Sequence, residues 1–462
     1  MDVTTYALMR KRVDSICINI KYPPAGLTAA VGDGVADDTA AIRAIIDYVA
    51  TGDGGIVYIP PGLYLVSSTI YISSNIKLIG AGSSVSIFKP VPAFTANEII
   101  GVTTNNVTIS NIGIDGNGSV LPGITACLNA WHANNLIIER CHFYNSFGTA
   151  LQLSSCNRCS IISCEVNGAL NGSMGIWAGG TDVGYDYGEH IILNNRLHDN
   201  ELDGLICASP NSKIINNYAY NNGLTPTNTA GGIYVSGTGS NGKKTIIALN
   251  HCFLNDGNGI DIAISCKDMI IAENECYENN SSGILIADDS TNIVVKNNVC
   301  KNNGKAPIVN QFDGITLLNN VTNCIVEGNR CYDDQTTKTQ IYGIHEVGAT
   351  TNYNIISGNI CSGNLTGGIS KIGENTILDR NIGYITENSG NATIVNGTTS
   401  IDVTHGLNIT PSINDISVTP TNSMGNASKY YISNVTATQF RINVNVDPGA
   451  TTAIFVWQIT TS

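Results

Sequence analysis

The chain has 462 residues, of which 42% are hydrophobic and only 13% are charged, with a formal net charge of −13. This charged share is about half of that in an ordinary soluble domain, which excludes a charged disordered chain and a long charged coiled coil. Lys and Arg form no cluster, so we expect neither nucleic acid nor an anionic membrane surface as a partner. No stretch of 18 apolar residues is present, and no transmembrane helix is expected.

The N-terminal part of the chain differs from the rest. Residues 1–30 contain YALMRKRVDSI, which predicts a short helix in an arm; no apolar stretch of signal-peptide length follows, so we expect no signal peptide. The next segment, VGDGVADDTAAIRAIIDYV, offers Asp37 or Asp38 as a helix N-cap, with Ile42 and Val49 at helical spacing. GGIVYIPPGLYLV then predicts two strands around a Pro-Pro-Gly turn. A helix at this place would close the open end of a stacked core.

A short repeat fills most of the chain: two or three apolar residues, then Asn, any residue and another apolar residue. Its copies lie 22 to 33 residues apart, and a second pattern, Gly followed by Ile or Leu, runs in phase with it. Each copy therefore carries at least two short strands, which predicts an all-β fold, a parallel β-helix of about 11–12 coils over residues 31–388. We expect the repeated asparagines to stack as a structural ladder at a bend. They are Asn195, Asn217, Asn250, Asn274, Asn298, Asn329, Asn359 and Asn381.

The 14 cysteines follow the same repeat. Free Cys behaves as a small buried hydrophobe, so we expect a row of reduced thiols in the core and no disulfides. Cys156-x-x-Cys159, with Cys164 and His142 nearby, lacks the second matching pair that a zinc site needs. We expect neither a metal nor another cofactor. The cysteines that occupy equivalent positions two residues after a ladder asparagine are Cys252, Cys276, Cys300, Cys331 and Cys361.

Three N-terminal segments, GDGVADDTAAI, GGIVYIPPGLYLV and IKLIGAG, together resemble the N-terminal signature of the pectate-lyase-like β-helix superfamily. This superfamily includes polygalacturonases, related polysaccharide lyases and phage tailspike depolymerases. The resemblance implies a right-handed parallel β-helix with an N-terminal capping helix. It leaves the reaction open, because the superfamily spans hydrolases, lyases, epimerases and proteins that only bind.

Residues 389–462 leave the repeat, and alternating segments such as QFRINVNV and TAIFVWQI predict a small β-sandwich-like domain. This part is similar to C-terminal modules of phage and prophage tail proteins, which trimerise or contact glycans. Residues 1–30 would then resemble a virion-attachment arm. The resemblance implies a homotrimer on a virion tail or otherwise outside the cell, with a bacterial surface glycan or a pectin-like polysaccharide as its partner.

Departures from the repeat are candidates for a functional site, because long loops on a rigid solenoid commonly carry binding residues. The interval from ladder Asn to Gly is 9 residues in four coils and 14 to 16 in three others, and the longer loops would wall a groove. On the outward face, the rings of Trp177 and Tyr234 would stack on sugars, and we expect Asn258 and His345 to bind substrate beside them. The whole outward row, two residues after each Gly, is Trp177, Ile206, Tyr234, Asp261, Leu285, Thr316, His345 and Ser370.

Carboxylates near this row are the candidate catalytic groups. Asp203 and Asp261 lie two coils apart, about 10 Å at the backbone. Side chains can close that gap to the separation of about 6.5–9.5 Å found in inverting glycosidases, in which one carboxyl protonates the leaving oxygen and the other activates water. Asp256, Glu201 and Asp313 are further candidates. The segment NDGNGID faintly resembles a polygalacturonase element, whereas the Gly-His-Gly and Arg-x-Lys elements of that family are absent.

The sequence therefore favours a tailspike-like polysaccharide depolymerase, a glycoside hydrolase with paired carboxylates. Two alternatives stay open: a non-catalytic receptor-binding or structural tail protein, and a pectate-lyase-like polysaccharide lyase or epimerase. A lyase needs a base, for which His345, Tyr234 and Lys371 are candidates, and a cation near the substrate carboxylate. Few basic residues fall near the candidate groove. Glu346 and Lys371 take positions that are apolar on earlier coils, and we expect a stacked ion pair between them.

Overall fold

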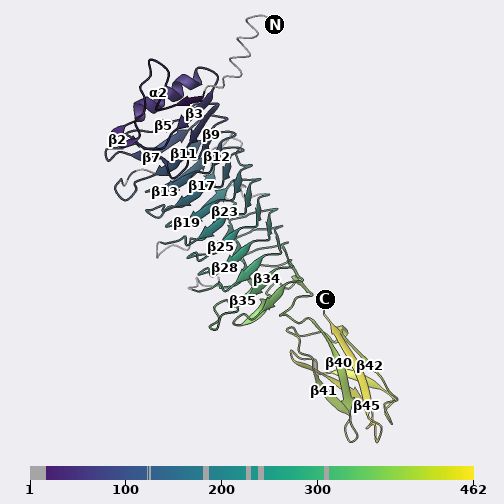
Figure 1. Cartoon of the computed structure of the whole chain (residues 1–462). Coiled ribbons are helices and arrows are strands. Elements are labelled where there is room, and N and C mark those ends of the chain that lie inside the picture. Colours follow the sequence, from purple (N-terminus) through teal and green to yellow (C-terminus); the bar gives the residue numbers. More distant parts are fainter. Residues whose placement is uncertain are drawn as a thin grey trace, which may run out of the picture.

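The computed structural model describes residues 17–121, 123, 126–180, 187–224, 230–237, 244–305 and 312–461. The chain winds into a long rod of stacked coils, with helix α2 (Thr39–Ala50) at one end and a group of antiparallel strands at the other (Figure 1). Each full coil adds one strand to each of three parallel sheets, so neighbours in a sheet come from successive coils. This confirms the predicted right-handed parallel β-helix. None of the described helices is long and apolar enough to cross a membrane.

The three walls of the rod are called sheets A, B and C. Sheet A contains β1 (Cys17–Asn19), β3 (Gly55–Ile59), β6 (Ile76–Gly80), β9 (Thr108–Ser110), β12 (Ile137–Glu139), β15 (Ser160–Ile162), β18 (Ile191–Leu193), β21 (Lys213–Ile215), β24 (Ile246–Ala248), β27 (Ile270–Ala272), β30 (Val294–Lys296), β33 (Ile325–Glu327), β36 (Ile355–Ser357) and β39 (Ile377–Asp379). Sheet B contains β2 (Asp33–Asp37), β4 (Gly62–Val66), β7 (Ser86–Pro90), β10 (Gly113–Asp115), β13 (His142–Tyr144), β16 (Glu165–Asn167), β19 (Arg196–His198), β22 (Tyr218–Tyr220), β25 (His251–Phe253), β28 (Glu275–Tyr277), β31 (Val299–Lys301), β34 (Arg330–Tyr332) and β37 (Ile360–Ser362). Sheet C contains β5 (Ile70–Tyr71), β8 (Glu98–Val102), β11 (Ala126–Trp131), β14 (Thr149–Ser154), β17 (Ile176–Gly179), β20 (Leu205–Ala208), β23 (Ile233–Ser236), β26 (Ile260–Ala263), β29 (Ile284–Ala287), β32 (Ile315–Leu318), β35 (Tyr342–Val347) and β38 (Gly367–Ser370).

The bend from sheet A to sheet B carries the predicted asparagine ladder. In a typical rung, the Asn298 side-chain amide donates to Ile271 O and to Asn329 Oδ1, both at 2.9 Å, and its own Oδ1 accepts from the Asn274 backbone and side chain. The tolerance of asparagine for unusual backbone angles is not what places the ladder residues at the bend. The left-handed position is the preceding residue, such as Asn297 with φ of 55°, and the ladder residue is buried to satisfy the backbone.

The predicted cysteine row lies in the core of sheet B. Cys276 pairs in register with Cys252 on one side and with Cys300 on the other, and Cys331 and Cys361 continue the row. All five are buried free thiols, and burial raises their pKa where a shift is resolved, as for Cys276 and Cys300. They pack as small apolar side chains, as predicted.

The N-terminal end of the rod is closed as predicted. Helix α2 buries Ile42, Ile45, Ile46 and Val49 completely against the first coils, where it contacts β3, β5 and β6. Asp38 is the N-cap, but its carboxylate accepts from Val31 N and Gly32 N and makes no side-chain bond to the helix. Strand β1 pairs with β3 and so extends sheet A. The helix expected in YALMRKRVDSI lies within residues 1–16, outside the described residues.

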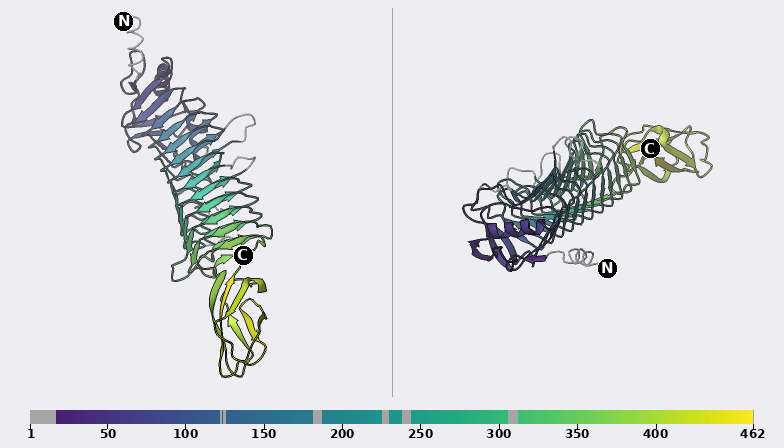
Figure 2. Two further views of the ribbon diagram at one scale, coloured as in Figure 1. Left: turned by 90° about the vertical axis from the view of Figure 1, so that its right-hand side faces the viewer. Right: turned by 90° about the horizontal axis from the view of Figure 1, so that it is seen from above.

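At the other end the polypeptide leaves the rod and forms two small antiparallel sheets (Figure 2). One contains β40 (Glu387–Ile394), β45 (Ala453–Thr460) and β42 (Ile416–Pro420), and the other contains β41 (Ser400–Thr404), β44 (Gln439–Val444) and β43 (Tyr430–Ser433). A short 3₁₀ helix, η2 (Ile413–Asp415), precedes β42. Phe440, Phe455 and Trp457 lie in their common core. This agrees with the predicted β-sandwich-like fold.

The last coils contain one clear departure from expectation. Glu346 is 1% exposed, but its carboxylate makes no ion pair with Lys371, which is exposed. It accepts instead from Asn354 Nδ2 at 2.9 Å, Thr376 Oγ1 at 2.7 Å and the backbone N–H groups of Ile372 and Gly373. The predicted ion pair is therefore wrong: neutral donors from the final turns satisfy this buried charge.

Candidate active site

The outward row of sheet C brings the residues singled out from the sequence into one line. Trp177 pairs with Ile206, Ile206 with Tyr234, and Tyr234 with Asp261. The line then continues through Leu285, Thr316, His345 and Ser370. The backbones of adjacent residues in this row are about 4.8 Å apart. The row is therefore a continuous track along the rod.

A groove of about 500 Å³ lies across the middle of this track. Asp203 and Asp261 both line it, together with Tyr234, and Asp288 lies farther along. Ala263, Leu285 and Ala287 form a small apolar cluster against which Tyr234 and Leu318 pack, so part of the otherwise polar groove is apolar. No Lys or Arg is among the described residues that line it. The remaining lining residues are Leu202, Ala230 and Asn319.

Asp261 is positioned to hold a proton at neutral pH. Its Oδ2 accepts from Asn258 Nδ2 at 3.1 Å, whereas its Oδ1 is buried and has no hydrogen-bond partner in the described part of the chain. Burial, and secondarily the negative charge of Asp203, raise the pKa of Asp261 to about 7. Asn258 is in turn fixed, because its Oδ1 accepts from Ser282 N at 2.9 Å.

Asp203 differs from Asp261 in its hydrogen bonding. Its Oδ1 accepts from the backbone N–H of Gly231 at 2.7 Å, which favours the ionised form. Burial nevertheless raises the pKa of Asp203 to about 7. The charge of Asp203 contributes to the raised pKa of Asp261, so ionisation of Asp203 favours the protonated form of Asp261. Such a pair can supply one acid and one base at the same time.

A second ionisable pair lies farther along the same sheet. Asp313 is fully buried and accepts from Thr316 Oγ1 at 3.1 Å and from Tyr342 N at 3.0 Å. Its Oδ2 also lies 2.9 Å from Nδ1 of His345, a side chain that is 21% exposed. Because a carboxylate can only accept, the hydrogen in this contact is on Nδ1, and in a neutral imidazole Nε2 would be an acceptor. The Tyr342 ring lies against the imidazole, at 4.6 Å between centroids.

The structure places the other candidate residues outside the groove. Glu201 Oε2 accepts from Gly172 N at 2.6 Å, which ties two turns together. Asp256 accepts from Asn280 Nδ2 at 2.7 Å and lines a separate groove with Leu224 at the bend between sheets B and C. Trp177 lies on the track but two strands from Tyr234, with Ile206 between them. From the predicted set, the groove therefore brings together Asp203, Asp261 and Tyr234, with Asn258 bonded to Asp261.

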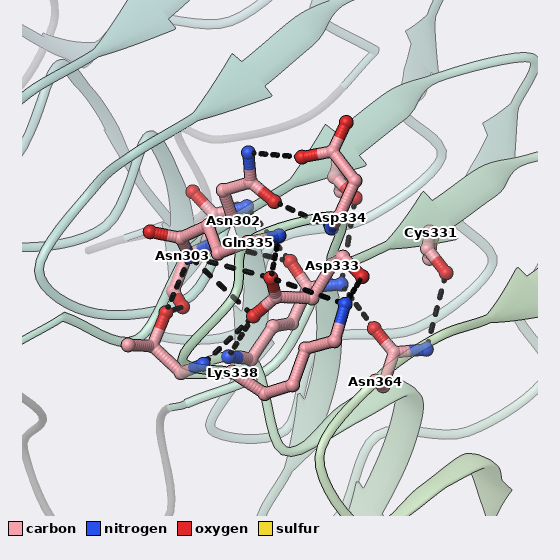
Figure 3. Close-up of polar contacts among 11 residues, drawn as sticks. Asn302, Asn303, Cys331, Asp333, Asp334, Gln335, Lys338 and Asn364 are labelled. Carbon is pink, nitrogen blue, oxygen red and sulfur yellow. Dashed lines mark hydrogen bonds and ion pairs between the residues drawn. The ribbon is translucent and has the colours of Figure 1, made fainter.

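One of the long loops predicted to wall the groove is fully described. The loop of residues 333–341 folds around the buried carboxylate of Asp333 (Figure 3), which accepts from the backbone of Gln335 at 2.9 Å and of Thr339 at 2.7 Å. Lys338 Nζ donates to the carbonyl of Asp333. Parts of the other long loops, residues 181–186, 225–229 and 306–311, lie outside the described residues.

Figure 3 also shows part of a feature that the sequence reasoning missed, a second amide ladder at the bend from sheet B toward sheet C. Asn303 Nδ2 donates to Gln340 Oε1 at 3.1 Å, and Gln340 Nε2 donates to Asn364 Oδ1 at 2.8 Å. A signal was present, because an asparagine follows most rungs of the first ladder by five residues. The loop around Asp333 displaces this rung in the sequence, and glutamine fills it. The earlier members are Asn200, Asn222, Asn255 and Asn279.

The described residues contain no group of three or more His, Cys, Asp and Glu side chains arranged to hold a metal ion. Cys156 and Cys159 are both buried at the turn before β15 and donate to nearby backbone carbonyls. His190 packs beside them, with Nδ1 accepting from Cys159 N at 3.3 Å. The ionisable side chains on the track are Tyr234, Asp261 and His345, with Asp203 in the groove and Asp313 bonded to His345.

Comparisons with known proteins agree with this architecture. Residues 28–241 match the family model "Rhamnogalacturonase A/epimerase, pectate lyase-like", and residues 170–330 match "Right handed beta helix region". Over residues 28–330 the chain thus resembles pectate-lyase-like and right-handed β-helix proteins. Over 115 residues it is 36% identical to mannuronan C5-epimerase AlgE1 of Azotobacter vinelandii, covering 22% of this chain and 8% of that protein. The match thus spans a small part of the relative's length.

Two solved structures illustrate the shared fold. The A-module of mannuronan C-5 epimerase AlgE4 from Azotobacter vinelandii aligns with a TM-score of 0.65 and 20% identity, over 76% of this chain and 97% of that one. The tailspike protein gp49 of Pseudomonas phage LKA1 aligns with a TM-score of 0.61 and 12% identity, over 93% of this chain and 98% of that one. At these identities the likeness establishes the β-helix and leaves the reaction to the site residues.

Proposed function

We propose that this protein binds a polysaccharide along sheet C and hydrolyses it between Asp203 and Asp261. The observation that carries the proposal is the carboxyl pair in one groove, with the pKa of each group raised to about 7. The apolar part of the groove beside Tyr234 suits the C–H faces of sugar rings, and Asn258 and the carboxyl groups suit their hydroxyls. Kinship with polysaccharide epimerases and with tailspikes supports a glycan substrate.

The hydrogen bonds assign different roles to the two carboxyl groups. Asp261, whose desolvated carboxyl has a pKa raised to about 7, is the general acid that gives its proton to the glycosidic oxygen as the bond to the anomeric carbon breaks. Asp203, whose ionised form is favoured by Gly231 N, is the base. It takes a proton from the water whose oxygen attacks the anomeric carbon from the opposite face. The two-coil separation leaves room for that water, which predicts inversion of configuration.

The charge of the groove indicates which glycan it accepts. Asp203, Asp261 and Asp288 line it without a basic partner in the described residues. A polymer with a carboxylate on each sugar would meet repulsion there, and chemistry at the carbon next to that carboxylate would lack a cation to neutralise it. We therefore propose a neutral polysaccharide, such as a bacterial surface glycan.

A second candidate function is uronate chemistry, as a lyase or an epimerase. The observation that favours it is the His345–Asp313 pair, in which Nε2 is an acceptor on the same track. A base at this place could take the C5 proton of a uronate. In a lyase the leaving oxygen then departs with a proton, and in an epimerase a proton returns to C5 from the other face. The relationship to mannuronan epimerases supports this alternative.

We further propose that the protein is a homotrimer on a virion tail or otherwise outside the cell, with residues 1–30 as an attachment arm whose strand β1 is anchored in sheet A, residues 31–388 as the β-helix, and residues 389–462 as the part that trimerises or contacts glycan. The likeness to tailspike gp49 and a 33% identity over 119 residues to the preneck appendage protein of Bacillus phage PZA support this assignment. Light scattering of the full chain tests it: a mass near three times 48.8 kDa is expected, and a monomer would contradict it.

The reaction is tested by incubating the protein with neutral capsular and storage polysaccharides, alginate and pectin. New reducing ends and the ultraviolet absorbance of unsaturated uronates are followed together. Hydrolysis gives reducing ends from a neutral polymer without that absorbance. Reducing ends accompanied by the absorbance would show a lyase, and altered C5 configuration without chain cleavage would show an epimerase. A protein that binds a glycan and leaves it intact would be a receptor-binding protein without catalysis.

A further inference from the structure

A larger groove lies at a different place, along the bend from sheet A to sheet B. It has a volume of about 730 Å³ and crosses several coils. Its apolar residues lie between amide and carboxylate side chains that come from the turn and from β25 and β28. The described residues that line it include no Lys or Arg. They are Leu193, Asn194, Ile215, Asn216, Leu249, His251, Glu273, Asn274, Glu275, Asn297 and Val299.

The centre of this groove is occupied by a leucine in an unfavourable backbone conformation. The turn residue before each ladder asparagine has a left-handed backbone, and Asn194, Asn216 and Asn297 fill this position on three coils, with φ of 54–59°. Asparagine tolerates that region. Leu249 takes the same position with φ of 59° and exposes 46% of its surface. Glu273 takes the same position on the next coil with φ of 57°, so asparagine is not required there, but a leucine that is nearly half exposed gains little from burial in exchange for the strained backbone.

The side chains around Leu249 form an ordered polar rim. The Tyr218 ring stacks on His251, with 4.7 Å between centroids and 11° between planes. Glu275 Oε2 lies 3.2 Å from Nδ1 of His251. On the turn, Asn216 Nδ2 donates to Asn194 Oδ1 at 2.8 Å. Donors and acceptors therefore repeat along the groove at the spacing of the coils, on both sides of an apolar floor.

We propose that this corner groove, defined by Leu193, Ile215, Leu249, His251 and Glu275, is a second binding site for a neutral glycan chain. The proposal rests on the proposed function, since the ligand is the polymer that sheet C cleaves. Leu249 contacts the C–H face of a sugar ring, and the amides and carboxylates bind its hydroxyls. Glu275 is paired with Lys301 Nζ at 3.2 Å and contacts His251, while Glu273 adds a further negative charge, so the groove offers a polyanion no excess of positive charge. The groove holds the polymer to the rod while another stretch of it lies on sheet C.

The test uses two leucines with the same backbone strain on one coil. Leu254 also has a left-handed backbone, with φ of 55°, and exposes 49% of its surface, but it lines a different groove. Leu249→Asn and Leu254→Asn each restore the residue type found at these turns, so each is expected to raise Tm by about 1 °C or more. Both variants are made with Asp261→Asn, which stops cleavage during binding.

Binding is measured by native affinity electrophoresis in gels that contain dextran, galactomannan or a neutral capsular polysaccharide, with alginate as the anionic comparison. At least one neutral polymer is expected to retard the Asp261→Asn protein. Leu249→Asn should weaken that retardation by about tenfold or more in apparent Kd, and Leu254→Asn should leave it unchanged. Equal retardation of both leucine variants, retardation by alginate alone, or none in any neutral gel would overturn the proposal. Whether the unsubstituted protein cleaves a neutral polymer tests the sheet C site separately.

Discussion

The bend between sheets A and B and the outer face of sheet C are built from the same coils, but they differ in how strictly the residue type repeats from coil to coil. At the bend, asparagine recurs from Asn195 to Asn381, and each buried amide is satisfied by the next. On sheet C, the residue type changes at almost every coil, and the buried Oδ1 of Asp261 has no partner. Repetition thus marks the scaffold, where stacking identical groups is stabilising. We propose that the breaks in repetition mark the surface that meets a ligand.

The largest effect is expected when Asp261, the proposed general acid on sheet C, is replaced. Asp261→Asn keeps the shape of the side chain and its contact with Asn258, but it removes the proton that the glycosidic oxygen needs. The rate of reducing-end formation should fall by about 10²–10⁴-fold. Asp256→Asn is the matched control, because Asp256 lies on the same coil in another groove, and its activity should be close to that of the unsubstituted protein. Equal losses in the two variants would contradict the assignment.

Substitutions in the asparagine ladder, at the bend from sheet A to sheet B, should change the stability of the protein and leave its catalytic activity unchanged. Asn298→Ala removes the donors to Ile271 O and Asn329 Oδ1 and the acceptor for Asn274. Leaving such buried groups unpaired should lower the free energy of unfolding by about 2–4 kcal/mol. Asn297→Gly, at the exposed left-handed turn residue next to it, should change stability by less than about 0.5 kcal/mol. Urea denaturation of both variants measures the contrast, and similar losses would mean that the ladder is not the stabilising element.

The carboxyl pair should also make stability depend on pH. Because the pKa of Asp261 is raised to about 7, the folded protein binds more protons than the unfolded chain between about pH 4 and pH 7. The contribution of Asp261 to the free energy of unfolding is fully present below the pKa of the unfolded chain, and it is lost as the pH rises through about 7. Relative to the unsubstituted protein, Asp261→Asn should therefore gain on the order of 4 kcal/mol between pH 4 and pH 8. A difference that does not vary with pH would show that Asp261 is ionised in the groove.

The smallest expected effect concerns the thiols. Among the described cysteines, only Cys17 is exposed, and the row of Cys276 and its neighbours is buried without disulfides. A thiol reagent should label one site quickly in the native protein and all 14 cysteines after denaturation without reductant. Fewer than 14 labelled thiols in the denatured protein would reveal a disulfide and contradict the packing assigned to the core.

The sequence was sufficient to predict what the coils repeat. The β-helix, the ladder of Asn195 and its relatives, the cysteine row and the alignment of Tyr234 with Asp261 all follow from a period that fixes which residues stack. Features that depend on loops were less accessible. Gln340 takes the place of an asparagine because the loop around Asp333 displaces the rung, and neutral donors from later turns satisfy Glu346 in place of Lys371.

The candidate site was predicted in its members but not in its environment. Spacing placed Asp203 and Asp261 on one face, whereas their raised pKa depends on burial against Leu285 and its apolar neighbours, which no spacing reveals. The contact between Asp313 and His345 crosses two coils, and the sequence offered the two residues only as separate candidates. Glu201 and Asp256 are carboxylates like those of the site, but they stabilise turns, because side-chain direction at a bend is set by local backbone geometry.

The most direct test of the central claim is a crystal structure of the Asp261→Asn protein with an oligosaccharide of the polymer that it degrades. We expect the sugar chain to lie along sheet C over Tyr234 and Leu285. One glycosidic oxygen should lie within hydrogen-bond distance of the substituted side chain, and a water should lie between the anomeric carbon and Asp203. A sugar chain centred on His345, with a uronate C5 facing its Nε2, would contradict hydrolysis and establish the lyase or epimerase alternative.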